Sequence, residues 1–163
     1  MLTNTDNNVI TSDEIKIPAT KHLPLWLSNF VNVYQQLSTD NLSLLTSIYH
    51  PNVTFVDPIH QVEGIDELHH YFEKLYQNLS SCQFEIDDIV YDGEQAAIYW
   101  CMTYQHTRLN KGKVVSVVGN SHLKVYEDKV IYHRDHLDLG AMLYEQLPVV
   151  GKLIKWLKAK AAQ

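Results

Sequence analysis

The sequence predicts an α+β fold, in which helices pack on one face of a curved antiparallel sheet. Apolar residues at helical spacing fill the first half of the chain, over residues 23–37, 40–50 and 65–79. Long aromatic or alternating segments then follow, over residues 82–91, 94–106, 114–126 and 129–137. Helices followed by a run of strands joined by short turns are typical of α+β domains. The length of 163 residues favours one domain with a single core.

Composition and charge exclude several classes of protein. The net charge of −6 provides no overall footprint for nucleic acid. The two cysteines, Cys82 and Cys101, have no metal-ligand spacing, and we expect reduced, buried thiols in a cytoplasmic protein. We see no N-terminal signal of basic residues followed by an apolar run, and no apolar run long enough to span a membrane. A glycine-rich phosphate loop is also missing, so we expect no cofactor.

The chain begins with a polar segment and a first helix. Residues 1–20 are rich in Asn, Thr, Asp and Ser and have no sustained periodicity, which predicts a disordered arm. A wide apolar stripe over residues 23–37 then predicts a helix, with Pro24 in its first turn. We therefore expect the folded domain to occupy residues 21–140, with a helical extension over residues 141–163.

A second short helix and a strand follow. Ser38, Thr39 and Asp40 are helix caps by type. The predicted inner face is Leu42, Leu45, Ile48 and Tyr49. Pro51 ends this helix in the prediction. The alternation over residues 53–57 then predicts a short strand that carries Phe55 and Asp57 on its apolar face, and Pro58 ends it.

The third helix is predicted over residues 65–79, after Gly64. Its predicted inner face is Ile65, Leu68, Phe72, Leu75 and Leu79. The strands that follow include residues 94–106, where Trp100 and Met102 share one face. Gly119 lies in the middle of the next strand and suggests a bulge or bend that would curve the sheet.

The last strand, within residues 129–140 (KVIYHRDHLDLG), contains the first sign of a functional site. Alternation places Ile131, His133, Asp135 and Leu137 on one face. A carboxylate among apolar residues must be paired, hydrogen-bonded or protonated, because an isolated buried charge is very unfavourable. Four histidines could suggest a metal, but their spacing fits no metal motif, so we expect none. They are His60, His106, His122 and His133.

Two segments resemble a known superfamily. Residues 53–58 (VTFVDP) with Gly64 resemble the ketosteroid isomerase segment that carries the catalytic aspartate. Residues 133–140 (HRDHLDLG) resemble the last-strand ending of limonene epoxide hydrolase and SnoaL-like polyketide cyclases. Both belong to the nuclear transport factor 2-like superfamily. The resemblance implies a cone-shaped domain with one apolar pocket, commonly a homodimer built on the outer face of the sheet, with Asp57 and Asp135 looking into the pocket.

The chain also departs from these relatives. Aligned on Leu37 and Asp57, the isomerase tyrosine falls on Val33, with Tyr34 out of phase, and its second aspartate falls on Ser121. The epoxide hydrolase needs an arginine and an aspartate where this chain has Trp100 and Met102. Neither known active site is therefore reproduced, and what remains is the SnoaL-like minimum of one aspartate in an apolar cavity.

The sequence supports two hypotheses of different classes. In the first, Asp135 is a general acid or base, with His133 beside it and Asp57 as a second carboxylate, in a cofactor-free isomerase, cyclase or hydratase. The pocket wall would include Trp100, Met102, Tyr34, Phe55 and Ser121. In the second, the protein binds an apolar molecule or a protein partner without chemistry. Asp135 would then only bond buried polar groups, and Asp57 would cap its turn.

The C-terminal extension is amphipathic and basic. Residues 148–163 hold four lysines and no acid, so the remainder has a charge of −10. The apolar arc of residues 149–162 could pack on the domain or on a second subunit. Alternatively, with Trp156, it could lie weakly on an anionic membrane surface.

Overall fold

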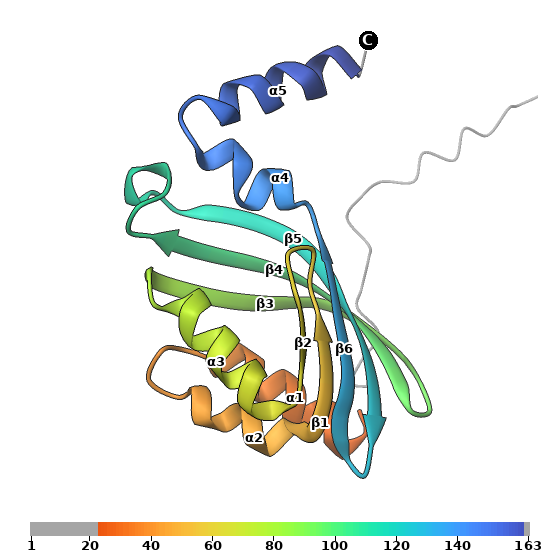
Figure 1. Ribbon diagram of the computed structural model, residues 1–163. Coiled ribbons are helices and arrows are strands. Elements are labelled where there is room, and N and C mark those ends of the chain that lie inside the picture. Colours follow the sequence, from red (N-terminus) through yellow and green to blue (C-terminus); the bar gives the residue numbers. More distant parts are fainter. Residues whose placement is uncertain (1–22, 162–163) are drawn as a thin grey trace, which may run out of the picture.

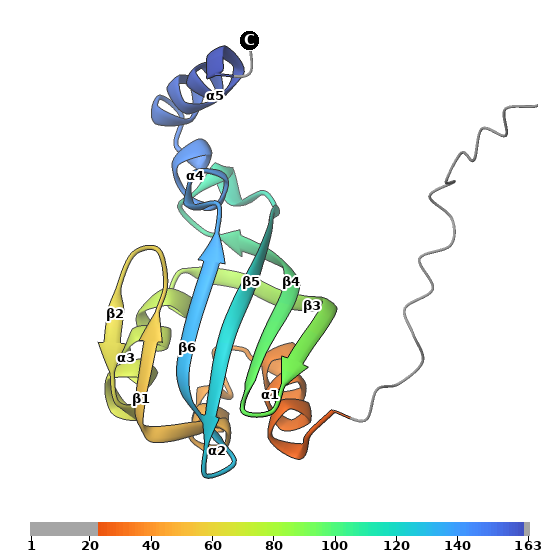
Figure 2. The ribbon, with the colours of Figure 1, turned by 90° about the vertical axis from the view of Figure 1, so that its right-hand side faces the viewer.

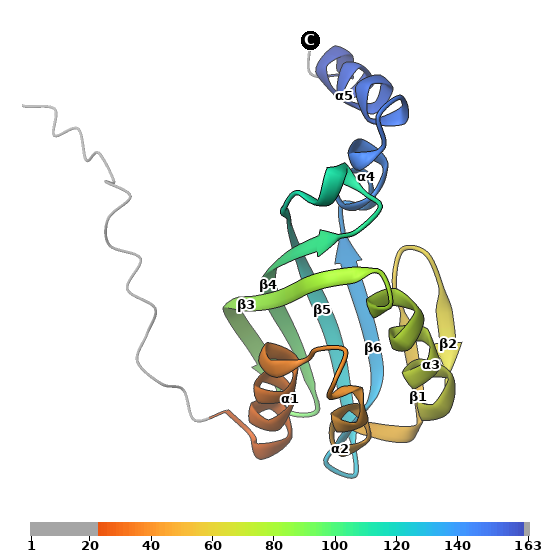
Figure 3. The same ribbon diagram turned by 90° about the vertical axis from the view of Figure 1, so that its left-hand side faces the viewer.

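The computed structural model describes residues 23–161, so the predicted N-terminal arm lies outside the described residues. Six strands form one curved sheet in the order β2-β1-β6-β5-β4-β3. Three helices of the first half, α1 (Leu25–Gln36), α2 (Leu45–Ile48) and α3 (Ile65–Tyr76), lie on one face of it (Figure 3). Figure 2 shows the sheet from its other face. The predicted α+β architecture is confirmed.

The sheet is mixed rather than wholly antiparallel. β1 (Tyr49–Val56) runs parallel to β6 (Lys129–Leu137), while β2 (Gln61–Glu63) pairs with β1 antiparallel. The remaining strands, β3 (Leu79–Asp92), β4 (Gln95–His106) and β5 (Val115–Tyr126), form antiparallel pairs that end on β6. A one-turn 3₁₀ segment, η2 (Asn110–Gly112), lies between β4 and β5.

The second predicted helix is shorter than expected, and Tyr49 does not belong to it. After the 3₁₀ turn η1 (Leu42–Leu44), α2 ends at Ile48 and β1 begins at Tyr49. Pro51 lies inside this strand, where the prediction made it a helix terminator. The pairing of β1 with β6 is irregular between Tyr49 and Thr54, so the missing N–H of Pro51 falls outside the regular ladder.

The third helix also ends earlier than predicted. α3 stops at Tyr76, and Leu79 already pairs with His106 in the sheet. The buried residues of α3 are Leu68, Tyr71, Phe72 and Tyr76, whereas Leu75 is 39% exposed. The large aromatic rings fill the arc that faces the sheet, which displaces Leu75 toward the edge of the core.

A bulge in β6 changes which apolar residue faces the core. Val130 pairs with Val125 and Tyr132 pairs with Lys124, so Ile131 has no opposite residue. Val130 is therefore buried in place of Ile131. His133, Asp135 and Leu137 keep the predicted inward face, since the alternation resumes after the bulge.

Gly119 does not form the predicted bulge, and glycine is needed at this position for another reason. It stays in regular register, between Trp100 on β4 and Leu137 on β6. A Cβ atom there would lie 2.4 Å from Trp100 Cη2 and 2.8 Å from the carbonyl oxygen of His136. Glycine is therefore required because the Trp100 ring lies directly over the backbone.

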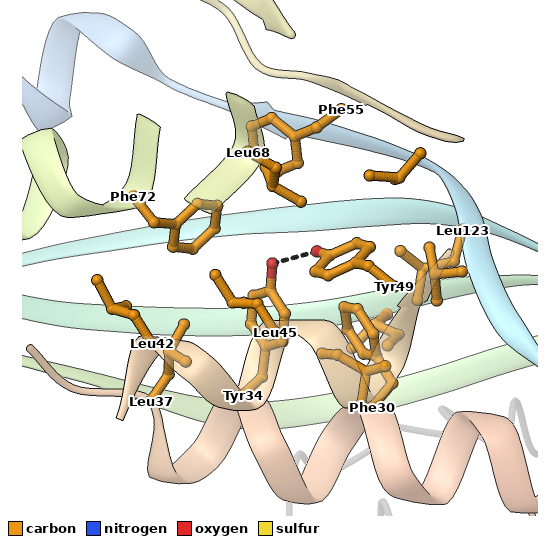
Figure 4. Packing of buried hydrophobic residues seen from close by; sticks show 14 of the residues in the cluster. Phe30, Tyr34, Leu37, Leu42, Leu45, Tyr49, Phe55, Leu68, Phe72 and Leu123 are labelled. Atoms are coloured by element: carbon orange, nitrogen blue, oxygen red, sulfur yellow. Dashed lines mark hydrogen bonds between the residues drawn. The ribbon is translucent and has the colours of Figure 1, made fainter. Parts of the chain in front are cut away.

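The core fills the space between helices and sheet. Figure 4 shows Phe30 and Tyr34 of α1 packed with Leu45, Tyr49 and Phe72. Beyond β6 the chain forms α4 (Leu139–Met142), the 3₁₀ turn η3 (Tyr144–Gln146) and α5 (Val150–Ala161). Figure 1 shows α5 beyond α4, well away from helices α1–α3. Within residues 23–161, no helix has both the length and the apolar character needed to cross a membrane.

Candidate functional site

A cavity of about 320 Å³ lies against the concave face of the sheet. Its wall is mostly apolar and comes from α1, α3, strands β1, β3, β4 and β6, and the α4 region. Six of the eight predicted site residues line it: Tyr34, Phe55, Asp57, Trp100, Met102 and Asp135. The two others, Ser121 and His133, lie behind this wall and contact Asp135.

A chain of hydrogen bonds runs through the core and ends at Asp135. The Tyr34 and Tyr49 hydroxyls lie 2.5 Å apart (Figure 4). The Tyr49 hydroxyl lies 2.5 Å from His133 Nδ1, and His133 Nε2 lies 2.7 Å from Asp135 Oδ1. His133 is fully buried, and the Asp135 side chain is 17% exposed. The chain therefore connects the first helix to the cavity wall.

The direction of this chain follows from its chemistry. Burial raises the pKa of both Tyr34 and Tyr49 well above the ordinary value, so both phenols stay protonated and can donate. A carboxylate oxygen accepts, so His133 Nε2 donates to Asp135 Oδ1 and Nδ1 is left as the acceptor. His133 Nδ1 then accepts from Tyr49, and Tyr49 accepts from Tyr34. Every donor in the chain thus points toward Asp135.

A second donor reaches Asp135 from β5. The Ser121 hydroxyl donates to Asp135 Oδ1 at 2.5 Å and accepts from Trp100 Nε1 at 2.8 Å. Both bonds to Asp135 therefore end on Oδ1. No residue of the described part of the chain bonds Oδ2. Asp135 is held from behind, with one oxygen left for the cavity.

Asp57 has a different environment. Its Oδ1 accepts from the backbone N–H groups of Ile59 and His60, at 2.7 and 2.8 Å. Its Oδ2 accepts from the Tyr71 hydroxyl. Burial and this bond raise the pKa of Tyr71, so it remains a donor. Both oxygens of Asp57 are thus engaged in holding the turn after β1 against α3.

The other end of the cavity is lined by α3, β3, β4 and α4. Burial raises the pKa of the Cys82 thiol to about 11, and burial together with Cys82 raises that of Tyr76. The Tyr104 hydroxyl donates to the carbonyl of Met142, which attaches α4 to β4. Within residues 23–161, no group of three or more His, Cys, Asp or Glu side chains is arranged to hold a metal ion.

Sequence reasoning placed Tyr34 in the pocket wall but missed Tyr49. Tyr49 was expected on a helix, yet from β1 it bonds His133. Tyr34 lines the cavity as predicted and is only 7% exposed, although it does not align with the isomerase tyrosine. The tyrosine-rich composition was the available signal, but only the fold brings residues 34, 49 and 133 together.

The sequence of this chain matches a known protein family. The family model of the SnoaL-like domain matches residues 30–133, most of the described domain. The chain belongs to the SnoaL-like family. This SnoaL-like protein has no match among the curated proteins.

Solved structures share its fold. A proposed SnoaL-like polyketide cyclase from Jannaschia sp. CCS1 is 13% identical, with a TM-score of 0.64 over 72% of this chain and 88% of the other. TerC, co-crystallised with polyporic acid, is 12% identical, with a TM-score of 0.64 over 72% and 94%. AclR, a proposed hydroxylase from Streptomyces galilaeus, is 19% identical, with a TM-score of 0.62 over 84% and 89%. At these identities the likeness establishes the nuclear transport factor 2-like fold alone.

Proposed function

We propose that this protein binds an apolar small molecule in the cavity and moves a proton on it through Asp135. The observation that carries the proposal is the one-sided bonding of this carboxylate. Oδ1 accepts from Ser121 and His133, and Oδ2 has no partner among the described residues. A carboxylate fixed in this way, at an apolar wall, can act as a general acid or base.

The proton balance of such a step needs no cofactor. Oδ2 takes a proton from one position of the ligand and returns it to another, as in an isomerisation or a cyclisation. Oδ1 keeps its two donors throughout, so the side chain does not rotate away when Oδ2 is protonated. His133 and Ser121 act as positioning residues, because both lie behind the cavity wall.

The cavity favours an apolar ligand. Its wall combines Trp100, Phe55 and Met102 with few polar groups, and about 320 Å³ suits a compound of drug-like size. The structural relatives support this class, since one is a proposed polyketide cyclase and TerC was crystallised with polyporic acid. In this proposal Asp57 shapes the cavity edge by holding its turn and does not exchange protons.

The first experiment identifies the ligand. Native mass spectrometry of the purified protein, followed by solvent extraction, reports the assembly and any retained compound together. We expect an apolar compound. We also expect a dimer on the outer face of the sheet, where Val118 is 71% exposed and Tyr99 is 44% exposed.

The second experiment tests the carboxylate on that compound. Asp135→Asn keeps an acceptor for Ser121 and His133 but removes the basic oxygen, so turnover should fall by about 100-fold or more with the fold intact. Asp128→Asn is the matched control, because this exposed turn residue has a φ of 59°, which asparagine tolerates. Unchanged turnover in Asp135→Asn refutes the proton-transfer role. Retention of the compound without any conversion by the unmodified protein would instead establish a binding protein.

A further inference from the structure

One face of α5 is apolar and exposed. Among the large apolar residues of this helix, Leu153 is 55% exposed, Trp156 54% and Leu157 48%. Val149, just before the helix, is 81% exposed. At 100° per residue these side chains lie within one arc of the helix. In the described part of the chain, Lys160 lies over the Trp156 ring, and the rest of this arc stays exposed. A soluble helix normally turns such a face toward its own core.

The opposite side of α5 is fixed to the domain. Gly151 is buried, and a Cβ atom there would lie 2.3 Å from the carbonyl oxygen of Glu145. Lys158 Nζ bonds Asp138 Oδ2 and Glu145 Oε1, each at 2.7 Å. These contacts hold the helix by the side that contains Gly151 and Lys158, and they turn the apolar arc outward.

The charges around the arc have one sign. Lys152 and Lys155 are exposed on the polar side, and Lys160 Nζ lies 5.2 Å above the ring of Trp156. The helix contains no acidic residue. Exposed apolar side chains, a tryptophan at the boundary and flanking lysines together match the interface of a bilayer that contains anionic lipids.

We propose that α5 docks the protein on an anionic lipid surface through Leu153, Trp156 and Leu157. Pairing of two α5 helices from two copies is disfavoured, because it would bring lysines against lysines. A membrane accepts the same arc and also neutralises the lysines with lipid phosphate. Docking does not depend on the proposed enzymatic step.

Docking on this surface would also place the cavity near lipid. Met142 and Leu143 line the cavity, and the chain reaches α5 a few residues later. Tyr104 attaches this segment to β4. α4 and α5 lie at the same end of the domain (Figure 1). An apolar compound dissolved in the bilayer would then have a short path into the cavity.

The test uses the full chain and vesicles. We expect it to cosediment with phosphatidylcholine vesicles that contain 30 mol% phosphatidylserine, and to bind pure phosphatidylcholine at least 10-fold more weakly. Tryptophan emission should shift to the blue on binding. Trp26 and Trp100 are buried in the free protein, at only 8% and 4% exposed, so the emission shift reports Trp156.

Variants separate the apolar arc from the charge. Leu153→Ser with Leu157→Ser should weaken partition to anionic vesicles at least 10-fold, while Val90→Ser with Val114→Ser, two exposed apolar residues elsewhere, should not. Lys152→Glu with Lys155→Glu leaves the apolar arc unchanged and should weaken binding to anionic vesicles only. Its matched control is Lys124→Glu with Arg134→Glu, on the sheet.

Each remaining outcome overturns the proposal. One is failure of the unmodified chain to bind anionic vesicles, and another is unchanged binding of the Leu153 and Leu157 variant. If that variant instead reduces the oligomeric state in the absence of vesicle binding, a second copy covers α5. If the protein turns over its compound in solution but does not bind vesicles, the docking proposal is refuted and the role of Asp135 stands.

Discussion

Tyr49→Phe removes a single oxygen atom from the centre of the buried hydrogen-bond chain. That hydroxyl contacts the Tyr34 hydroxyl and His133 Nδ1, each at 2.5 Å. Tyr34 also lies 3.4 Å from His133 Nδ1, so a small movement can restore one bond. One buried polar group then stays poorly paired, at about 1–3 kcal/mol. A loss of about 2 kcal/mol lowers the melting temperature of a chain of this size by roughly 4–8 °C.

Guanidinium denaturation and differential scanning calorimetry at pH 7 measure this loss. Tyr126→Phe is the matched control, because its ring is 54% exposed and its stability should change by less than about 0.5 kcal/mol. Tyr34→Phe should destabilise less when Tyr49 is already phenylalanine, since their shared bond is gone. A Tyr49→Phe protein as stable as the unmodified one would refute the chain as a stabilising network.

Two further predictions concern the sheet and the cavity wall. Gly119→Ala should destabilise the protein by about 1–3 kcal/mol in denaturant titration, because its Cβ would meet the Trp100 ring at 2.4 Å. In a Trp100→Phe protein, Gly119→Ala should cost less stability. An equal loss with Trp100 and with phenylalanine at position 100 would contradict the steric cause. The pKa of Cys82 is raised to about 11, so at pH 8 this thiol holds roughly 100-fold less thiolate than a thiol with the ordinary pKa of 9.0. Iodoacetamide should therefore label Cys82 about 100-fold more slowly in the folded than in the unfolded protein, as measured by peptide mapping. Equal labelling rates would show that the thiol is not buried as described.

Local patterns were sufficient for most of the fold. The alternation of residues 94–106 placed Trp100 and Met102 on the inner face, and the last strand was placed with His133 and Asp135 facing inward. These predictions hold because each strand buries one face, and a period of two leaves little freedom. The boundaries of α2 and α3 were less accurate, since a proline can stand in an irregularly paired strand and aromatic rings outcompete leucine for the core.

Tertiary context decided the rest. The Ile131 bulge depends on the register between β5 and β6, which no residue of β6 encodes by itself. The role of Gly119 depends on Trp100, nineteen positions earlier in the chain. The chain of bonds from Tyr34 to Asp135 joins α1, β1 and β6 across 101 positions. Local sequence patterns placed Asp135 and His133 on one face of the last strand, but not the two tyrosine hydroxyls that continue the chain from His133.

The most direct test of the account is a crystal structure of Asp135→Asn with the compound that copurifies with the protein. This variant keeps the support of Ser121 and His133 and should stop conversion, so the bound compound is the substrate. We predict a polar or proton-bearing atom of the compound within about 3.2 Å of the side-chain atom that replaces Oδ2. A compound that occupies only the end of the cavity near Met142 and Leu143, with residue 135 untouched, would contradict the central role of Asp135.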